Sequence, residues 1–259
     1  MIAASELVGP FGTPELERRF GGLSRLYGDA GYQRIRAMRV AIVGLGGVGS
    51  WAAEALARSG VASLTLVDFD QVAESNINRQ VQALGATIGQ SKVDALGERI
   101  ADIHPGCRVN RVDEFVDEDN WPGLLPQPVD IVIDACDQIR AKCVIAAWAM
   151  RTTGGLVVVG AAGGKRQPHA VQVDDLGFVT HDRLLASLRQ RLRKQHGAAR
   201  SGRMGVRCVF SRELAAAPGQ TCAADGSLNC HGYGSSVGVT ATFGMVAASL
   251  AVEFATERE

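Results

Sequence analysis

A glycine-rich stretch near the start of the chain has the residue types and spacing of a nucleotide-binding loop. In VAIVGLGGVGSWAAEALARSG an apolar run precedes the pattern Gly-x-Gly-Gly-x-Gly, made by Gly44, Gly46, Gly47 and Gly49. Glycines at this spacing allow a tight turn, a close approach of the backbone to phosphate or ribose, and close packing of the next helix. Asp68 ends the following apolar run, where a carboxylate can accept hydrogen bonds from both ribose hydroxyls. This glycine loop and Asp68 predict an adenine-nucleotide site, with NAD and ATP both open.

The polar residues that follow favour a triphosphate. Asn76 and Arg79 lie in SNINRQ, and Lys92 follows GQS. A triphosphate needs such cations and polar donors, whereas the pyrophosphate of NAD is bound mainly by neutral backbone donors. Asp134 and Asp137 in IVIDACDQIR follow a predicted strand, where a carboxylate can hold Mg²⁺ on phosphates. Either aspartate could instead cap the helix that follows.

Apolar strands and helical segments alternate around these residues. Nearly continuous apolar runs predict buried parallel strands at 39–44, 64–68, 109–112, 130–134 and 156–160. Helices are expected between them, at 47–59, 91–103 and 137–150. This alternation predicts an α/β fold, Rossmann-like and doubly wound, with a mainly parallel central sheet that binds ligands at its carboxyl edge.

The C-terminal part is expected to elaborate this core within a single domain. The domain would span 1–259, with a nucleotide-binding core at 18–160 and a substrate-side elaboration at 161–259. The elaboration contains a glycine-rich loop, a short strand near Val171, an arginine-rich helix, a further apolar strand, a long loop and a last helix. The segment 236–254 has a single charged residue and approaches membrane-spanning length. Its threonines and glycines favour a helix buried in the fold over a membrane contact.

Charge and cysteine content exclude several classes of protein. The chain has 259 residues with 27 basic and 27 acidic side chains, so its net charge gives no argument for a DNA or membrane partner. Its 6 cysteines form no Cys-x-x-Cys pair, and a chain of this length needs no disulfides, so reduced thiols are expected. The N-terminus lacks the pattern of a secretory signal. We therefore expect a cytoplasmic protein.

Five motifs in order, GLGGVGS, LVDFD, SNINRQ, GQSK and DACD, resemble the ubiquitin-activating-enzyme-like superfamily of adenylating proteins, which includes the ThiF, MoeB and HesA proteins. The resemblance implies that the adenine of ATP lies near the glycine loop and that Asp68 binds its ribose. It also implies that the phosphates are bound by Asn76, Arg79 and Lys92. Asp137 would bind Mg²⁺, and with Arg79 and Lys92 it would serve catalysis.

Further segments resemble one family within this superfamily, the tRNA threonylcarbamoyladenosine dehydratases. These segments are RFGGLSRLYGDAG, GGVGSWAAEALARSG, GAAGGK, GVRCVFS and VTATFGMVA. The resemblance implies an enzyme that uses ATP and Mg²⁺ to dehydrate and cyclise N⁶-threonylcarbamoyladenosine, beside the anticodon of tRNA, through an acyl-adenylate. Relatives that adenylate sulfur-carrier proteins usually have two Cys-x-x-Cys pairs for zinc, and this sequence has none.

The resemblance also implies partners. Many members of the superfamily form homodimers in which an N-terminal arginine reaches the phosphates of the partner subunit's ATP. The equivalent position here is Gly22, and Arg25, about one turn further on, is the candidate for that catalytic role. Cys222 and Cys230 lie in the long loop before the last helix. They are either free thiols or reactive thiols that accept sulfur from a partner such as a cysteine desulfurase.

A basic segment is the candidate contact for tRNA. Basic residues gather between Arg183 and Arg207, and the candidates for phosphate contacts are Arg189, Arg191, Arg193, Lys194 and Arg203. Such a patch can bind the nucleic-acid backbone without reading bases. The alternative is an ordinary solvated helix face.

Two other kinds of function remain open at this point. An adenylyltransferase that activates the C-terminus of a small sulfur-carrier or ubiquitin-like protein would share the whole nucleotide site. An NAD-binding oxidoreductase or a non-catalytic nucleotide sensor would share only the glycine loop and Asp68. The oxidoreductase would also need a hydride-transfer site, and the sequence offers no obvious catalytic histidine.

Overall fold

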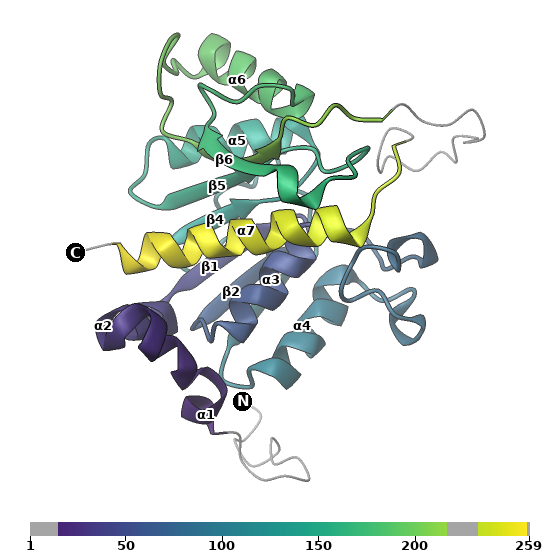
Figure 1. Cartoon of the computed structure of the whole chain (residues 1–259), viewed down its shortest axis with the longest axis vertical. Helices are drawn as coiled ribbons and strands as arrows, with labels where there is room; N and C mark the ends of the chain where they lie inside the picture. The colour runs from purple at the N-terminus through teal and green to yellow at the C-terminus, as the bar shows by residue number, and fades with distance from the viewer. Residues whose placement is uncertain (1–14, 217–232, 258–259) are drawn as a thin grey trace.

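A seven-stranded sheet forms the centre of the molecule (Figure 1). The structure is a computed structural model that describes residues 15–216 and 233–257. The strand order is β3-β2-β1-β4-β5-β7-β6, and all neighbours are parallel except β6 and β7. The strands are β1 (Arg39–Val43), β2 (Ser63–Val67), β3 (Arg108–Val112), β4 (Ile131–Asp134), β5 (Gly155–Val159), β6 (Val171–Asp175) and β7 (Arg207–Ser211). The predicted α/β fold with a mainly parallel sheet is confirmed.

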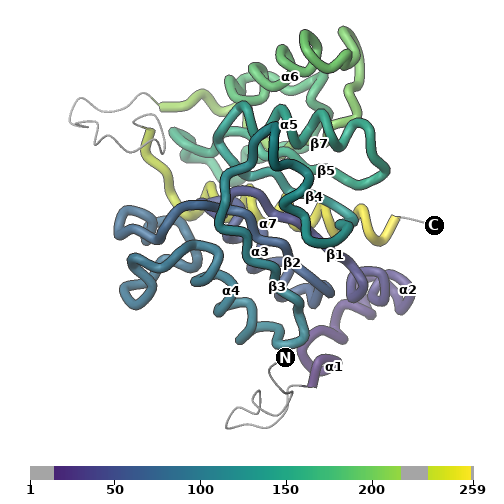
Figure 2. The backbone as a smooth tube through the Cα atoms, turned by 180° about the vertical axis from the view of Figure 1, so that it is seen from behind, coloured from purple at the N-terminus to yellow at the C-terminus, as the bar shows by residue number. Residues whose placement is uncertain are grey.

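Helices cover both faces of the sheet. They are α1 (Leu16–Phe20), α2 (Ser24–Ala37), α3 (Gly49–Arg58), α4 (Lys92–Ile103), α5 (Ile139–Ala149), α6 (Arg183–Gln195) and α7 (Val237–Thr256). Alternate residues of a strand point to opposite faces. Val40 and Ile42 therefore pack with α3, α4 and α7, whereas Ala41 and Val43 pack with α5. Figure 2 shows the molecule from behind, with α5 and α6 on the side opposite α7.

The C-terminal elaboration extends the core sheet. Strand β7 pairs with β5, and β6 returns antiparallel along β7 to form the sheet edge. Helix α6 begins at Asp182, whose carboxylate accepts a hydrogen bond from the Leu185 backbone N–H at 3.0 Å. The other carboxylate oxygen accepts from the backbone N–H of Ala161, at 2.8 Å. Asp182 thus joins the loop after β5 to the start of α6.

The last helix, α7, is a core helix of the fold. Its length and composition would also fit a membrane span, but half of its most apolar window is buried against the protein. It lies across one face of the sheet, where it packs against α3 and contacts β5 (Figure 1). Gly244 allows a close approach to α3, because an added Cβ would lie 2.9 Å from the Cβ of Trp51. The expectation of a buried apolar helix at 236–254 is therefore confirmed within two residues.

Candidate functional site

The glycine loop connects β1 to α3 at the carboxyl edge of the sheet. Gly44 has a φ of 86°, in the left-handed region that glycine adopts without strain. A Cβ added there would lie 2.7 Å from the backbone nitrogen of Cys136, which follows β4. A Cβ on Gly49 would overlap the carbonyl oxygen of Gly44. The loop therefore needs glycine at both positions, because any side chain there would collide with backbone atoms.

Two side chains hold the peptide groups of Leu45 inside this loop. Asp68 accepts a hydrogen bond from the Leu45 backbone N–H at 2.5 Å, and Gln82 donates its side-chain amide N–H to the Leu45 carbonyl at 2.9 Å. The second oxygen of Asp68 accepts from the backbone N–H of Asp70 at 2.9 Å. Burial raises the pKa of Asp68, and the positive charge of nearby Lys92 offsets only part of that effect, so the pKa stays above its ordinary value. Asp68 thus lies at the predicted ribose position and also organises the loop.

Lys92 lies buried beside the two aspartates that follow β2. Its Nζ is 2.6 Å from a carboxylate oxygen of Asp70 and 3.8 Å from one of Asp68. It begins α4 directly after Ser91, whose hydroxyl accepts from the Asp94 backbone N–H as a helix cap. Asp70, two residues after Asp68, forms the shorter of these two ion pairs. The ammonium group is thereby held next to the predicted ribose position.

Asn76 ends a short 3₁₀ helix (Glu74–Asn76) between β2 and α4, and Arg79 lies in the turn that follows. The Arg79 guanidinium donates to the Ser75 carbonyl at 2.6 Å and to the Asn78 side-chain oxygen at 2.9 Å. Asn76 is buried, and its side-chain oxygen accepts from the Ala73 backbone N–H at 3.1 Å. A Cβ added to Gly47 would lie 3.2 Å from Cγ of Arg79. The structure therefore brings Arg79 against the glycine loop, as a phosphate contact requires.

The first turn of α7 completes this side of the site. A Cβ added to Gly47 would also lie 3.1 Å from Cβ of Thr240. Immediately before α7, the carbonyl of Ser235 accepts a hydrogen bond from the side-chain amide of Asn78 at 3.0 Å. The contribution of α7 was not predicted from the sequence, because its N-terminus is far from the glycine loop along the chain.

Asp137 and Asp134 follow β4 but have different environments. Asp137 is exposed, and within residues 15–216 and 233–257 its carboxylate has no hydrogen-bond or ion-pair partner. Asp134 is fully buried. Neither of them caps α5, which begins after Gln138 without a side-chain cap, so that alternative is wrong. Asp137 is therefore the aspartate of this pair that can face a ligand.

Lys142 is the residue of the site that sequence reasoning missed. It is fully buried, and its Nζ lies 3.1 Å from a carboxylate oxygen of Asp134. Burial lowers the pKa of this lysine, but the charge of Asp134, its hydrogen bond and the nearby cysteines together outweigh that effect, so the pKa is raised overall. The signal was the helical periodicity: Lys142, Ile145 and Ala149 are three and four residues apart and share the buried face of α5.

The donor set at this edge fits a magnesium ion bound together with phosphates. Mg²⁺ usually takes one or two protein carboxylates and fills its remaining positions with water and phosphate oxygens. The exposed carboxylate of Asp137 meets that requirement. Among the described residues, no group of three or more His, Cys, Asp or Glu side chains could form a metal cage. The exposed carboxylate of Asp137 thus suits a nucleotide-bound Mg²⁺.

The predicted N-terminal arginine lies away from the glycine loop. Arg25 is exposed in the first turn of α2, which precedes β1, whereas the glycine loop follows β1 (Figure 1). The two therefore lie at opposite edges of the sheet within one chain. Cys222 and Cys230 lie outside the described residues. The four cysteines within them, Cys107, Cys136, Cys143 and Cys208, are free.

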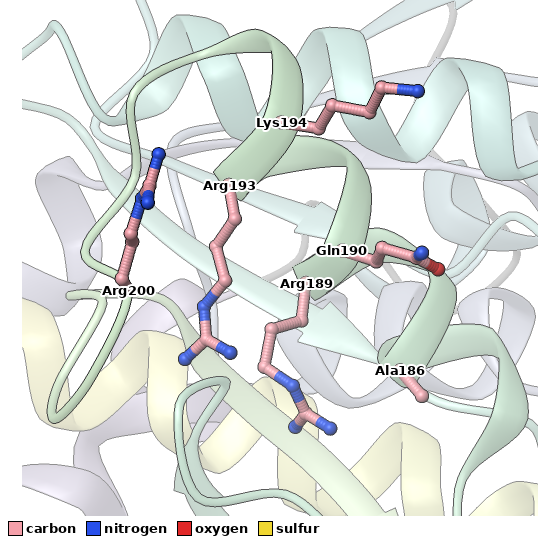
Figure 3. A pocket seen from close by; sticks show the side chains of 6 residues that line it. All are labelled: Ala186, Arg189, Gln190, Arg193, Lys194 and Arg200. Carbon is pink, nitrogen blue, oxygen red and sulfur yellow. The ribbon is translucent and has the colours of Figure 1, made fainter.

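The predicted tRNA residues divide into different surroundings around α6. A hollow of about 540 Å³ is lined by Arg189, Arg193, Lys194 and Arg200, among others (Figure 3). The Arg189 guanidinium donates to the carbonyls of Leu176 and Val179, at 3.0 and 2.7 Å. Arg189 thus ties α6 to the loop before it, a structural role that the sequence did not indicate.

The remaining basic residues are held less firmly. Nε of Arg193 donates to the Ala199 carbonyl at 3.0 Å. Arg191 lies on the α5 side, near enough to Cys143 to lower the pKa of a thiol that burial raises overall. Arg203 is exposed in the loop before β7. The candidate phosphate contacts of the hollow are therefore Arg193 and the exposed Lys194 and Arg200.

The family is decided by a match along most of the chain. The model of the ThiF family matches residues 18–257. The chain belongs to the ThiF family. This match includes the glycine loop, the residues after β2 and the whole of α7, so the family resemblance predicted from the motifs is confirmed.

Within the ThiF family the chain is similar over nearly its whole length to dehydratases. It is 43% identical over 248 residues to the tRNA threonylcarbamoyladenosine dehydratase of Escherichia coli, covering 91% of this chain and 92% of that protein. The crystal structure of that E. coli enzyme, TcdA, in complex with ATP has a TM-score of 0.84 at 42% identity, covering 92% and 93% of the two chains. The chain is also 37% identical to the E. coli molybdopterin-synthase adenylyltransferase, but only over 112 residues, which cover 43% of this chain.

Proposed function

We propose that this protein is a tRNA threonylcarbamoyladenosine dehydratase that uses ATP to cyclise N⁶-threonylcarbamoyladenosine. The observation that carries the proposal is the similarity to the E. coli dehydratase, in sequence and in fold, across more than nine-tenths of both chains. The similarity to a carrier-protein adenylyltransferase covers less than half of this chain.

The chemistry requires activation of a carboxylate. An oxygen of the threonyl carboxylate attacks the α-phosphorus of ATP, which forms an acyl-adenylate and releases pyrophosphate. The neighbouring carbamoyl group then attacks the acyl carbon, loses a proton and expels AMP, which closes a five-membered ring. The net change in the nucleoside is the loss of one water. Ring closure is intramolecular, so it gains from proximity and needs no enzyme nucleophile.

The residues of the carboxyl edge have distinct roles in this reaction. Asp68 accepts the ribose hydroxyls, and the backbone of the glycine loop approaches the phosphates. Arg79, Lys92 and Asn76 bind the phosphates, and the two cations stabilise the charge that develops on them. Asp137 would hold Mg²⁺, which when bound supplies further neutralisation of phosphate charge.

A product assay tests the function. The protein is incubated with ATP, Mg²⁺ and threonylcarbamoylated tRNA, and the digested nucleosides are analysed by mass spectrometry. We expect the modified nucleoside to lose one water, and an ¹⁸O label in the threonyl carboxylate to appear in AMP, because that oxygen bridges to phosphorus. An unchanged nucleoside, with ATP–pyrophosphate exchange that depends on a protein ending in Gly-Gly, would identify a carrier adenylyltransferase instead.

We also propose a homodimer in which Arg25 serves the partner subunit's ATP. What supports this is the position of Arg25, exposed at the edge of the sheet opposite the glycine loop of its own chain. A cytoplasmic location and a sulfur-transfer role for Cys222 or Cys230, with a cysteine desulfurase as partner, remain proposals from the sequence.

The hollow on α6 is the proposed contact for the tRNA backbone. Reversing the charge of both Arg193 and Arg200 to glutamate is expected to weaken tRNA binding at least about tenfold at low salt, because two phosphate contacts become repulsive. The salt dependence should also become shallower, with the logarithmic slope smaller by about 2. Filter binding of tRNA over a range of salt concentrations measures both.

The matched control is Arg151→Glu, which reverses an exposed charge just after α5. It should bind tRNA normally, and all variants should bind ATP normally. Arg189 is unsuitable for this test, because its loss would release the carbonyls of Leu176 and Val179. Unchanged tRNA affinity in the double variant at low salt would remove the hollow from the interface.

A further inference from the structure

Lys142 joins the carboxyl ends of two neighbouring strands beneath the nucleotide site. Its Nζ donates to the backbone carbonyl of Asp134, the last residue of β4, at 3.2 Å, and to the carbonyl of Val159, the last residue of β5, at 2.8 Å. Its third acceptor is the Asp134 carboxylate, at 3.1 Å. All three donor positions of the ammonium group are used, so this lysine is fixed in one geometry.

The Asp134 carboxylate carries this constraint to the turn that follows β4. The oxygen bound by Lys142 also accepts from the backbone N–H of Cys136 at 3.2 Å and from its thiol at 3.0 Å. The Ala135 backbone N–H donates to the carbonyl of Val43 at the end of β1, at 2.8 Å. The turn at 135–137 is therefore fixed at Cys136 by the Asp134 carboxylate and at Ala135 by the backbone of β1.

This turn is in direct contact with the glycine loop. The Cβ that Gly44 lacks would lie 2.7 Å from the backbone nitrogen of Cys136 and 2.8 Å from its Cα. Asp137 is the next residue along the chain. A displacement of Cys136 would therefore move both the first glycine of the loop and the carboxylate proposed for Mg²⁺.

We propose that the buried Asp134–Lys142 pair is the positioning element of the Mg²⁺–ATP site, which fixes the turn at 135–137 so that the Asp137 carboxylate meets the nucleotide phosphates. The inference rests on the proposed role of Asp137. It assigns no contact with substrate to Asp134 or Lys142, which act through Cys136.

The burial of this pair argues that it does more than add stability. Removing two charges from water is costly, and apolar residues of similar size often replace a buried ion pair without loss of stability. The second carboxylate oxygen of Asp134 is buried and lacks a hydrogen-bond partner among the described residues. An unsatisfied acceptor is itself unfavourable. The pair is thus better explained by the geometry it imposes on the turn.

The test uses a variant in which the pair is neutral. In Asp134→Asn/Lys142→Met no buried charge is left alone, and the introduced amide side chain keeps an oxygen for the Cys136 N–H. Titration calorimetry measures ATP binding with Mg²⁺ and with a chelator, and the melting temperature checks the fold. We expect binding of Mg²⁺–ATP to weaken at least about tenfold and metal-free ATP binding to change much less. The single variant Lys142→Arg, which keeps the charge and the hydrogen-bond donors, should retain Mg²⁺–ATP binding better than the neutral pair does.

The control breaks an ion pair elsewhere in the fold, between a buried carboxylate and a partly exposed arginine. Glu54 in α3 is buried and accepts from the guanidinium of Arg99 in α4 at 2.7 and 3.1 Å. Arg99→Met should lower the melting temperature without changing how Mg²⁺ strengthens ATP binding. An equal loss of Mg²⁺–ATP affinity in this control would reduce the effect to general destabilisation and overturn the proposal.

A folded neutral-pair variant with unchanged Mg²⁺–ATP affinity would also overturn the proposal. If that variant does not fold, hydrogen exchange of the wild-type protein decides, because a positioned turn requires slow exchange of the Cys136 amide; rapid exchange rejects the proposal and slow exchange supports it. If Mg²⁺ does not strengthen ATP binding in the wild-type protein, the role of Asp137 fails, and this outcome is separate from the product assay.

Discussion

Asp137→Asn is expected to lower the rate of carboxylate adenylation at least about 100-fold while the melting temperature stays unchanged. The side chain is exposed and holds no other described residue in place, so its loss costs little stability. The neutral amide is a poor ligand for Mg²⁺, and the charge that develops on the transferred phosphate would lose its neutralisation. Rapid-quench measurement of pyrophosphate release at several Mg²⁺ concentrations gives the rate and the apparent metal affinity.

The control for this prediction is Glu118→Gln, which removes an exposed carboxylate beyond β3. Its rate should equal that of the wild-type protein. A normal rate for Asp137→Asn at every Mg²⁺ concentration would exclude Asp137 as the metal ligand.

Gly49→Ala is expected to destabilise the fold by about 3 kcal/mol, the upper part of the range for an overpacked core. The added methyl group would overlap the carbonyl oxygen of Gly44, and it would lie 3.3 Å from Cβ of Ala135. Backbone atoms cannot rotate away as a side chain can, so α3 must shift relative to the sheet. Urea unfolding measures the loss, and ATP binding should disappear with it because the glycine loop moves.

Gly46→Ala separates the loss of fold stability from the loss of ATP binding. An added Cβ there meets no atom within 4 Å among the described residues, and the φ of Gly46 is outside the left-handed region. We expect normal stability and weaker ATP binding, because the methyl group would occupy the surface that the phosphates approach. If Gly49→Ala were as stable as Gly46→Ala, the packing described for the loop would be wrong.

The sequence predicted the central features of the fold because they depend on local patterns. Continuous apolar runs define buried parallel strands, and those at residues 40 to 43 and 64 to 67 were located to within a residue or two. The glycine loop and Asp68 were found for the same reason, since strand ends in such a sheet meet at one edge. The helix expected at 91–103 was equally local, and the structure has it at Lys92–Ile103, capped by the Ser91 hydroxyl.

What could not be predicted depends on contacts between distant parts of the chain. The helical spacing of Lys142 indicates a buried side chain, but its bonds to the ends of β4 and β5 require those strands to be adjacent, and no pattern in the sequence gives their pairing. Asp70 and Lys92 are 22 residues apart, and only the fold shows that they form an ion pair. Arg189 resembles its exposed neighbours in sequence, but the carbonyls of Leu176 and Val179 turn it into a structural residue.

The hydrogen bonds to the Leu45 backbone have a consequence for the thermodynamics of nucleotide binding. Because Asp68 accepts from the N–H of Leu45 and Gln82 donates to its carbonyl, two successive peptide groups are fixed and the glycine loop is pre-formed by the protein's own contacts. A preorganised loop loses little conformational entropy when a ligand docks, so more of the contact energy remains as affinity. Asp68 therefore keeps the loop ready whether or not a nucleotide is bound, and its proposed bonds to the ribose hydroxyls would be a second contribution that depends on the ligand.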